Sequence, residues 1–149
     1  MRARNGLLLG FACLVVVAGP AAARAEHARL ARHLIDEVGG ERGVWGVLGA
    51  RDMDTVLALA RSSGLLLHVR EPDAGEVEAA RKVADRAGLY GTRIIVEEGP
   101  LDDLPYADNL LDAVICTWLS DRDLDAISWA EVRRVLRPGG TAILGRARL

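Results

Sequence analysis

The stretch GVWGVLGARDMDTVLALARSSGLLLHV, residues 43–69, decides the fold of this protein. It opens with a short apolar run at residues 43–49 that is typical of a buried strand. An apolar pattern at helical spacing follows over residues 53–64 and ends in Ser-Ser-Gly, which predicts a short helix. A second apolar run at residues 65–69 predicts another strand. Two strands joined by a helix in this way indicate parallel neighbours with a right-handed crossover.

The same alternation of helix and strand continues along the chain. In REPDAGEVEAARKVADRAG, Asp73 can cap a helix that Gly88 ends. The other predicted elements are a leading helix at 27–40, strands at 92–96, 111–118 and 141–145, and a helix at 124–136 followed by the turn RPGG. This pattern predicts an α/β fold, a doubly wound, Rossmann-like parallel sheet of about five strands. Because the sequence ends four residues after the fifth strand, we expect a domain truncated at that strand.

The N-terminal 25 residues have the features of a secretory signal peptide. Two arginines precede an apolar run from Leu7 to Ala18, and the small residues of Ala23-Arg24-Ala25 form a cleavage pattern. We expect cleavage before Glu26, export to the periplasm or medium, and a single folded domain at residues 26–149. The alternative is an uncleaved N-terminal anchor.

Composition excludes some functions. The chain is 50% hydrophobic and 27% charged, as in a globular domain with one core. Its formal net charge is −2, and it becomes −5 without residues 1–25, which hold three arginines and no acid. With Lys82 as the only lysine and no basic run, we expect no nucleic-acid partner. The cysteines and histidines lack metal-ligand spacing, so we expect no metal site, and Cys116 is interpreted as a small buried hydrophobe.

The loops that follow the strands are the candidate site, because ligands of doubly wound sheets bind beyond the carboxyl ends of the strands. Gly49 can make the tight turn after the first strand, whereas Arg51 and Met53 carry bulky side chains that we expect to obstruct a ligand. Glu71 follows the second strand, where an acid can accept hydrogen bonds from both hydroxyls of a ribose. The alternative is a surface acid that begins a turn, and Asp73 is more simply a helix cap.

Four stretches carry a family resemblance: GVWGVLGARD, LLLHVREPDAGEVEAARKVADRAGLYG, EEGPLDDLPYADNLLDAVI and AEVRRVLRPGGTAIL. Together they resemble the cofactor-binding half of class I S-adenosylmethionine-dependent methyltransferases. The variant with GLYG and LPYADNL is similar to the N-terminal domain of some exported proteins that continue into a pyrroloquinoline-quinone-type β-propeller.

This resemblance implies a set of cofactor-binding residues. Gly49 matches the first glycine of the family's G-x-G-x-G turn, Asp52 matches a polar position within it, and Glu71 matches the ribose-binding acid. Arg51 and Met53 replace the second and third glycines.

Two further positions follow from the resemblance. The acid that contacts adenine in the family falls on Pro100 here, and Asp102 lies two positions late. Thr117 and Trp118 match positions that often face the substrate, although we expect Trp118 to be part of the core.

The resemblance therefore predicts a methyltransferase-like domain whose cofactor, S-adenosylmethionine, would meet a degenerate loop, with weak or no activity. Export would also separate the chain from cytosolic S-adenosylmethionine. The alternatives are an active methyltransferase, a non-catalytic exported binding or spacer module, and a nicotinamide-binding oxidoreductase fragment, which the missing G-x-G-x-x-G disfavours. The sequence identifies no catalytic residue, methyl acceptor or protein partner.

Overall fold

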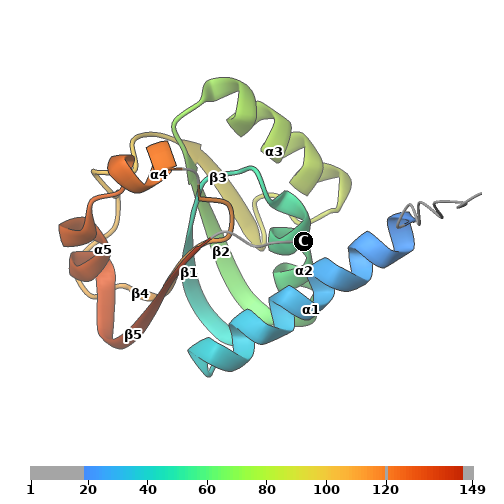
Figure 1. Ribbon diagram of the computed structural model, residues 1–149, viewed down its shortest axis with the longest axis horizontal. Helices are drawn as coiled ribbons and strands as arrows, with labels where there is room; N and C mark the ends of the chain where they lie inside the picture. Colours follow the sequence, from blue (N-terminus) through green and yellow to red (C-terminus); the bar gives the residue numbers. More distant parts are fainter. Residues whose placement is uncertain (1–18, 120, 146–149) are drawn as a thin grey trace, which may run out of the picture.

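The computed structural model describes residues 19–119 and 121–145 (Figure 1). Helices and strands alternate along the chain, as the sequence pattern predicts. The elements are α1 (Pro20–Val38), β1 (Arg42–Leu48), α2 (Met53–Ser62), β2 (Gly64–Glu71), α3 (Ala74–Arg86), β3 (Ile94–Glu98), β4 (Leu111–Cys116), α4 (Asp121–Ala126), α5 (Trp129–Val135) and β5 (Leu136–Leu144).

The five strands form one parallel sheet in the order β3-β2-β1-β4-β5, which confirms the predicted α/β fold. The chain builds the sheet outward from β1 to β3, then returns to the other side of β1 with β4. The direction of winding therefore reverses between β1 and β4. At such a reversal the loops after neighbouring strands diverge and leave room for a ligand at their carboxyl ends.

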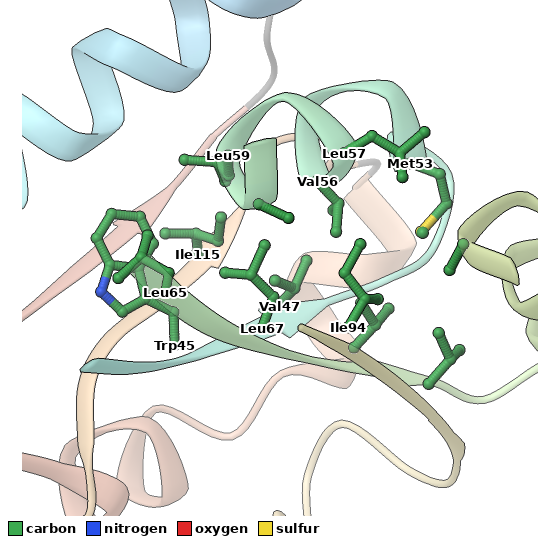
Figure 2. Close-up of a cluster of buried hydrophobic side chains, with 14 of the residues drawn as sticks. Trp45, Val47, Met53, Val56, Leu57, Leu59, Leu65, Leu67, Ile94 and Ile115 are labelled. Atoms are coloured by element: carbon green, nitrogen blue, oxygen red, sulfur yellow. The ribbon is translucent and has the colours of Figure 1, made fainter. Parts of the chain in front are cut away.

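Helices cover both faces of the sheet, with α1, α2 and α3 on one face and α4 and α5 on the other (Figure 1). Along β2 the alternate residues Leu65, Leu67 and Val69 are fully buried beneath the first three helices. Figure 2 shows this core, in which Trp45 and Leu59 are also fully buried. Removing this apolar surface from water is the main stabilising term of the fold.

The opposite face of β2 is covered by the connection between β3 and β4. Tyr106 in this connection forms a hydrogen bond with His68, in which the Tyr106 hydroxyl oxygen lies 2.6 Å from His68 Nδ1. The two rings meet edge to face. Burial lowers the pKa of His68 and raises that of Tyr106.

Arg134 of α5 fixes the same connection. Its guanidinium donates to the carbonyl oxygens of Leu104 and Tyr106 at 2.9 and 2.7 Å and to both carboxylate oxygens of Glu131. The hydrogen bonds from Arg134, aided by one from the Leu104 amide, lower the pKa of Glu131 to about 2.

One sequence prediction near the C-terminus is wrong, and a second differs in its details. The single helix expected at 124–136 is two helices, because Ser128 is the N-cap of α5 and accepts a hydrogen bond from the Glu131 amide. The expected turn RPGG lies within the bounds of β5, but residues 137–140 fall in the register shift between the pairs Leu111–Leu136 and Ala113–Thr141, so the regular pairing begins at the predicted strand. A Cβ at Gly140 would lie 2.9 Å from the Arg137 carbonyl oxygen and 3.1 Å from the Asp112 carbonyl oxygen, so this shift requires glycine there.

The expected leader falls partly outside the described residues, which begin at Gly19. From there the chain enters α1, and every residue from Gly19 to Glu26 is exposed. The packed residues of α1 come later: Ala31, Leu34 and Ile35. Within the described ranges, no helix has both the length and the apolar character needed to cross a membrane.

Candidate functional site

A pocket of about 190 Å³ lies beyond the carboxyl ends of β1, β2 and β4. It occupies the position where the winding of the sheet reverses. Its walls come from the loops after these strands, from the β3–β4 connection and from the end of α4. The lining residues are Val47, Leu48, Gly49, Arg51, Asp52, Glu71, Pro72, Asp73, Leu101, Cys116, Thr117, Trp118 and Ala126.

The loop after β1 makes its turn with one glycine. Gly49 has a φ of 88° and donates its amide to the Arg70 carbonyl oxygen at 2.8 Å. Among the described residues other than glycine, only Asn109 has a positive φ, so Arg51 and Met53 adopt ordinary conformations. The turn therefore does not require glycine at the second and third positions of the family's motif.

The two bulky side chains of this loop point to different places. Met53 is 7% exposed and belongs to the core under α2, where Figure 2 shows it, so the prediction that it obstructs a ligand is wrong. The first turn of a helix directs this position toward the sheet. Arg51 is exposed and lines the pocket, so it is the one of the two that can affect a ligand.

Glu71 holds the pocket loops together. One carboxylate oxygen accepts a hydrogen bond from the Ala50 amide at 2.8 Å, and the other accepts one from the Asp73 amide at 3.0 Å. The residue is only 8% exposed, so the alternative of a surface acid is wrong. A carboxylate offers about four acceptor positions, and two of these remain for a ligand.

Asp52 connects the glycine loop to β4. Its Oδ1 accepts a hydrogen bond from the Thr55 amide at 3.2 Å and so caps α2, a role that an aspartate directly before a helix could have indicated. Its Oδ2 accepts one from the Thr117 hydroxyl at 2.7 Å. His27 of α1 also approaches, with Nδ1 3.4 Å from Asp52 Oδ1 and 3.0 Å from the Thr55 hydroxyl.

The side of the pocket next to β3 is apolar. Leu101 is 5% exposed and lines it, whereas Pro100 and the exposed Asp102 do not. Asp102 therefore supplies no acid there. Leu101 was not among the predicted site residues, although its place just after a strand end was a usable signal.

The wall formed by the end of β4 differs in part from the prediction. Trp118 lines the pocket but is 46% exposed, so the expectation that it belongs to the core is wrong. Cys116 is 3% exposed and belongs to a cluster of buried residues with Leu111 and Val114, which confirms the interpretation as a small buried residue. Asp73 caps α3, as predicted, through the Glu76 amide at 2.9 Å. In the part of the chain that is described, no group of acids, histidines and cysteines could hold a metal ion.

The profile of a family described as a methyltransferase domain matches residues 49–144. Comparison with curated proteins found no match. Among solved structures, a candidate S-adenosyl-L-methionine-dependent methyltransferase from Methanococcus maripaludis is 24% identical with a TM-score of 0.69, over 81% of this chain and 56% of that one. A candidate sarcosine dimethylglycine methyltransferase from Galdieria sulphuraria is 22% identical with a TM-score of 0.66, over 83% and 47%.

A geranyl diphosphate methyltransferase in complex with S-adenosylmethionine is 18% identical with a TM-score of 0.62, over 85% of this chain and 56% of that one. These likenesses establish the shared fold, and the chain spans about half the length of the structures it matches. The resemblance to class I methyltransferases is confirmed. The likeness to domains that precede a β-propeller stays a prediction.

Proposed function

Because the chain belongs to the methyltransferase domain family, we propose that it binds S-adenosylmethionine in the pocket beyond β1, β2 and β4 with weak or no methyl transfer. The observation that carries this proposal is the Glu71 carboxylate, buried at the pocket wall and oriented by two backbone amides. Its two remaining acceptor positions suit the two hydroxyls of a ribose.

The other lining residues fit parts of this cofactor. Leu101 and Trp118 give apolar surface for a flat base, and Gly49 leaves open space, since a Cβ there would meet no atom within 4 Å. The fit is incomplete on the side of the base, because Pro100 stands where the family has an acid. We propose that the cofactor is held by Gly49, Asp52 and Glu71. Asp52 contributes by fixing the loop through its hydrogen bonds to Thr55 and Thr117.

The proposal of weak or no transfer rests on what the polar side chains of the pocket already do. S-adenosylmethionine supplies an activated methyl group, so the protein's part is to hold an acceptor in line with it. Asp52 and Thr117 bond to each other, and Glu71 bonds to the backbone, so each of these groups positions the pocket. Arg51 brings a positive charge toward a ligand that is itself a positive sulfonium.

A non-catalytic exported binding module is the second candidate, and one observation favours it. Glu71 and Asp52 each bond to backbone groups that shape the loop, so the fold alone accounts for both side chains.

Calorimetric titration of S-adenosylhomocysteine into the purified chain tests the proposal. We expect micromolar binding that weakens at least tenfold in Glu71→Gln, while Glu98→Gln binds like the wild type. Glu98 is a matched control because it pairs with Glu71 in the sheet register, is exposed, and has no side-chain hydrogen bond within the described residues. Circular dichroism verifies that both variants fold. No binding by a folded wild-type chain would favour the second candidate, and binding of NADH instead would favour the nicotinamide alternative.

Export is proposed on the sequence of residues 1–25 together with the packing of α1. Cleavage before Glu26 would remove only exposed residues of this helix and leave Ala31, Leu34 and Ile35 in the core. Intact mass measurement of the chain recovered from an exporting bacterial host should give a first residue of Glu26. A full-length mass in the cytosolic fraction would contradict export, and a full-length mass in the membrane fraction would favour the uncleaved anchor.

A further inference from the structure

A second hollow lies between α1 and α2, apart from the cofactor pocket. These helices run side by side on one face of the sheet (Figure 1). The groove between them has a volume of about 600 Å³. Its lining residues are Arg24, His27, Ala28, Arg32, Asp54, Leu57, Ala58, Arg61 and Ser62.

The groove concentrates positive charge in a chain whose formal net charge is −2. Its lining includes three arginines, Arg24, Arg32 and Arg61, and a single acid, Asp54. All three arginines are exposed, and none has an ion pair or side-chain hydrogen bond to another described residue. Their guanidinium groups are therefore available to a ligand, whereas Arg70, Arg93 and Arg134 are held by carbonyl oxygens.

Helical spacing explains the hollow. Arg24, Ala28 and Arg32 follow one another at intervals of four residues and lie on one face of α1. The small side chain of Ala28 leaves space between the two guanidinium groups, and Ala58 does the same on α2 beside Arg61. The arginines thus flank a concave floor of small residues, where a low-dielectric wall strengthens their field.

The acid and the histidine of the groove are engaged with each other and with α2. His27 Nε2 lies 3.9 Å from Asp54 Oδ2, and His27 Nδ1 lies 3.0 Å from the Thr55 hydroxyl. Among the described residues, Asp54 forms no ion pair with any of the three arginines. His27, which lines the groove, also lies 3.4 Å from Asp52, which lines the cofactor pocket.

We propose that this groove binds a phosphate group through Arg32 and Arg61, which remain after cleavage before Glu26, with Arg24 added in the chain that keeps residues 1–25. Guanidinium groups bind phosphate oxygens in pairs of parallel hydrogen bonds, and several of them around one hollow match the charge and the number of oxygens of a phosphate. The phosphate can come from a soluble ligand or from a lipid headgroup. The lipid source has a sequence argument for the uncleaved chain, since the apolar run at residues 7–18 ends six residues before Arg24.

Titration of sodium pyrophosphate into the full chain, and flotation with vesicles of phosphatidylglycerol and phosphatidylcholine, test the proposal and distinguish the sources. The test variant is the double substitution Arg32→Gln/Arg61→Gln. The control is Arg86→Gln/Arg133→Gln, which removes the same charge from two exposed arginines outside the groove. Circular dichroism establishes that both variants fold.

We expect at least tenfold weaker pyrophosphate binding in the groove variant and a change below twofold in the control, since each lost charge-assisted contact is worth about tenfold. Binding only to phosphatidylglycerol vesicles, lost in the groove variant alone, supports a lipid headgroup. Pyrophosphate binding without vesicle binding supports a soluble ligand. No binding of either probe by the wild type, or equal losses in the two variants, would overturn the proposal.

Discussion

Replacing Glu71 by alanine should destabilise the protein before any ligand is considered. The Glu71 carboxylate accepts a hydrogen bond from the Ala50 amide, and Ala50 is only 4% exposed. Without the carboxylate, the N–H group of Ala50 would have neither a protein partner nor water to bind. A hydrogen bond to a charged group contributes about 1.5–3 kcal/mol. The Asp73 amide lies at an exposed residue where water can replace the carboxylate, which adds about 1 kcal/mol or less. We expect the free energy of unfolding to fall by about 2–4 kcal/mol.

Urea unfolding followed by far-ultraviolet circular dichroism measures this loss, with Glu98→Ala as the control. The control should stay within about 0.5 kcal/mol of the wild type, as is usual for an exposed side chain without specific partners. If Glu71→Ala unfolds at the same urea concentration as Glu98→Ala, the carboxylate does not hold the loop and the reasoning fails. The size of the expected loss is also the reason why binding tests should use Glu71→Gln, which keeps one acceptor oxygen, in place of Glu71→Ala.

Three further changes test the fold. Gly49→Ala should lower the free energy of unfolding by about 1–2 kcal/mol, because the φ of 88° strains any residue with a Cβ. The new methyl group meets no atom within 4 Å, so the loss comes from backbone strain alone, and an unchanged urea midpoint would contradict the left-handed turn at Gly49. Leu59→Ala empties a fully buried position and should cost about 2–5 kcal/mol by the same measurement, whereas a value below 1 kcal/mol would mean that the core collapses around it. Glu131 has its pKa lowered from 4.5 to about 2 by Arg134, so its stabilising contribution is present above pH 4.5 and is lost as the pH falls toward 2. Urea midpoints across this range should fall less steeply in Glu131→Gln than in the wild type, and parallel curves would refute the assignment.

Most of the fold could be predicted from the sequence because the apolar runs and their end signals agree. The strand beginning at Arg42, the helix beginning at Met53 and the strand ending at Glu71 lie within a few residues of the predicted bounds. The predictions failed where tertiary contacts outweigh local pattern. A helix-like pattern continues through Ser128, yet this side chain caps a new helix. RPGG has turn composition, and its residues are the unpaired part of β5 at the register shift with β4.

The site could be located from the sequence but not described. The carboxyl ends of the strands, Gly49 and Glu71 follow from position and spacing, and Asp52 follows from the family resemblance; the structure brings these residues to one pocket. Spacing gives no information on where a side chain points. For this reason Met53 was expected in the pocket and lies in the core, while Trp118 was expected in the core and lies at the pocket.

Arg51 is therefore the substitution in the loop that should matter for binding. Met53 lies in the core and neither position needs a left-handed backbone, so the shape of the turn survives the loss of two glycines. What remains is the guanidinium at the pocket, which repels the sulfonium of S-adenosylmethionine but not the neutral thioether of S-adenosylhomocysteine. The interaction of an exposed charge with a ligand contributes up to about 1 kcal/mol, which corresponds to up to about fivefold in affinity. The ratio of the affinity for S-adenosylhomocysteine to that for S-adenosylmethionine should therefore be up to about fivefold higher in the wild type than in Arg51→Gly. Calorimetry with both ligands gives this ratio, and Arg86→Gln should leave it unchanged. An equal ratio in the wild type and Arg51→Gly would mean that Arg51 points its charge into solvent. The departure of this loop from the family's glycine motif would then have no electrostatic consequence for the ligand.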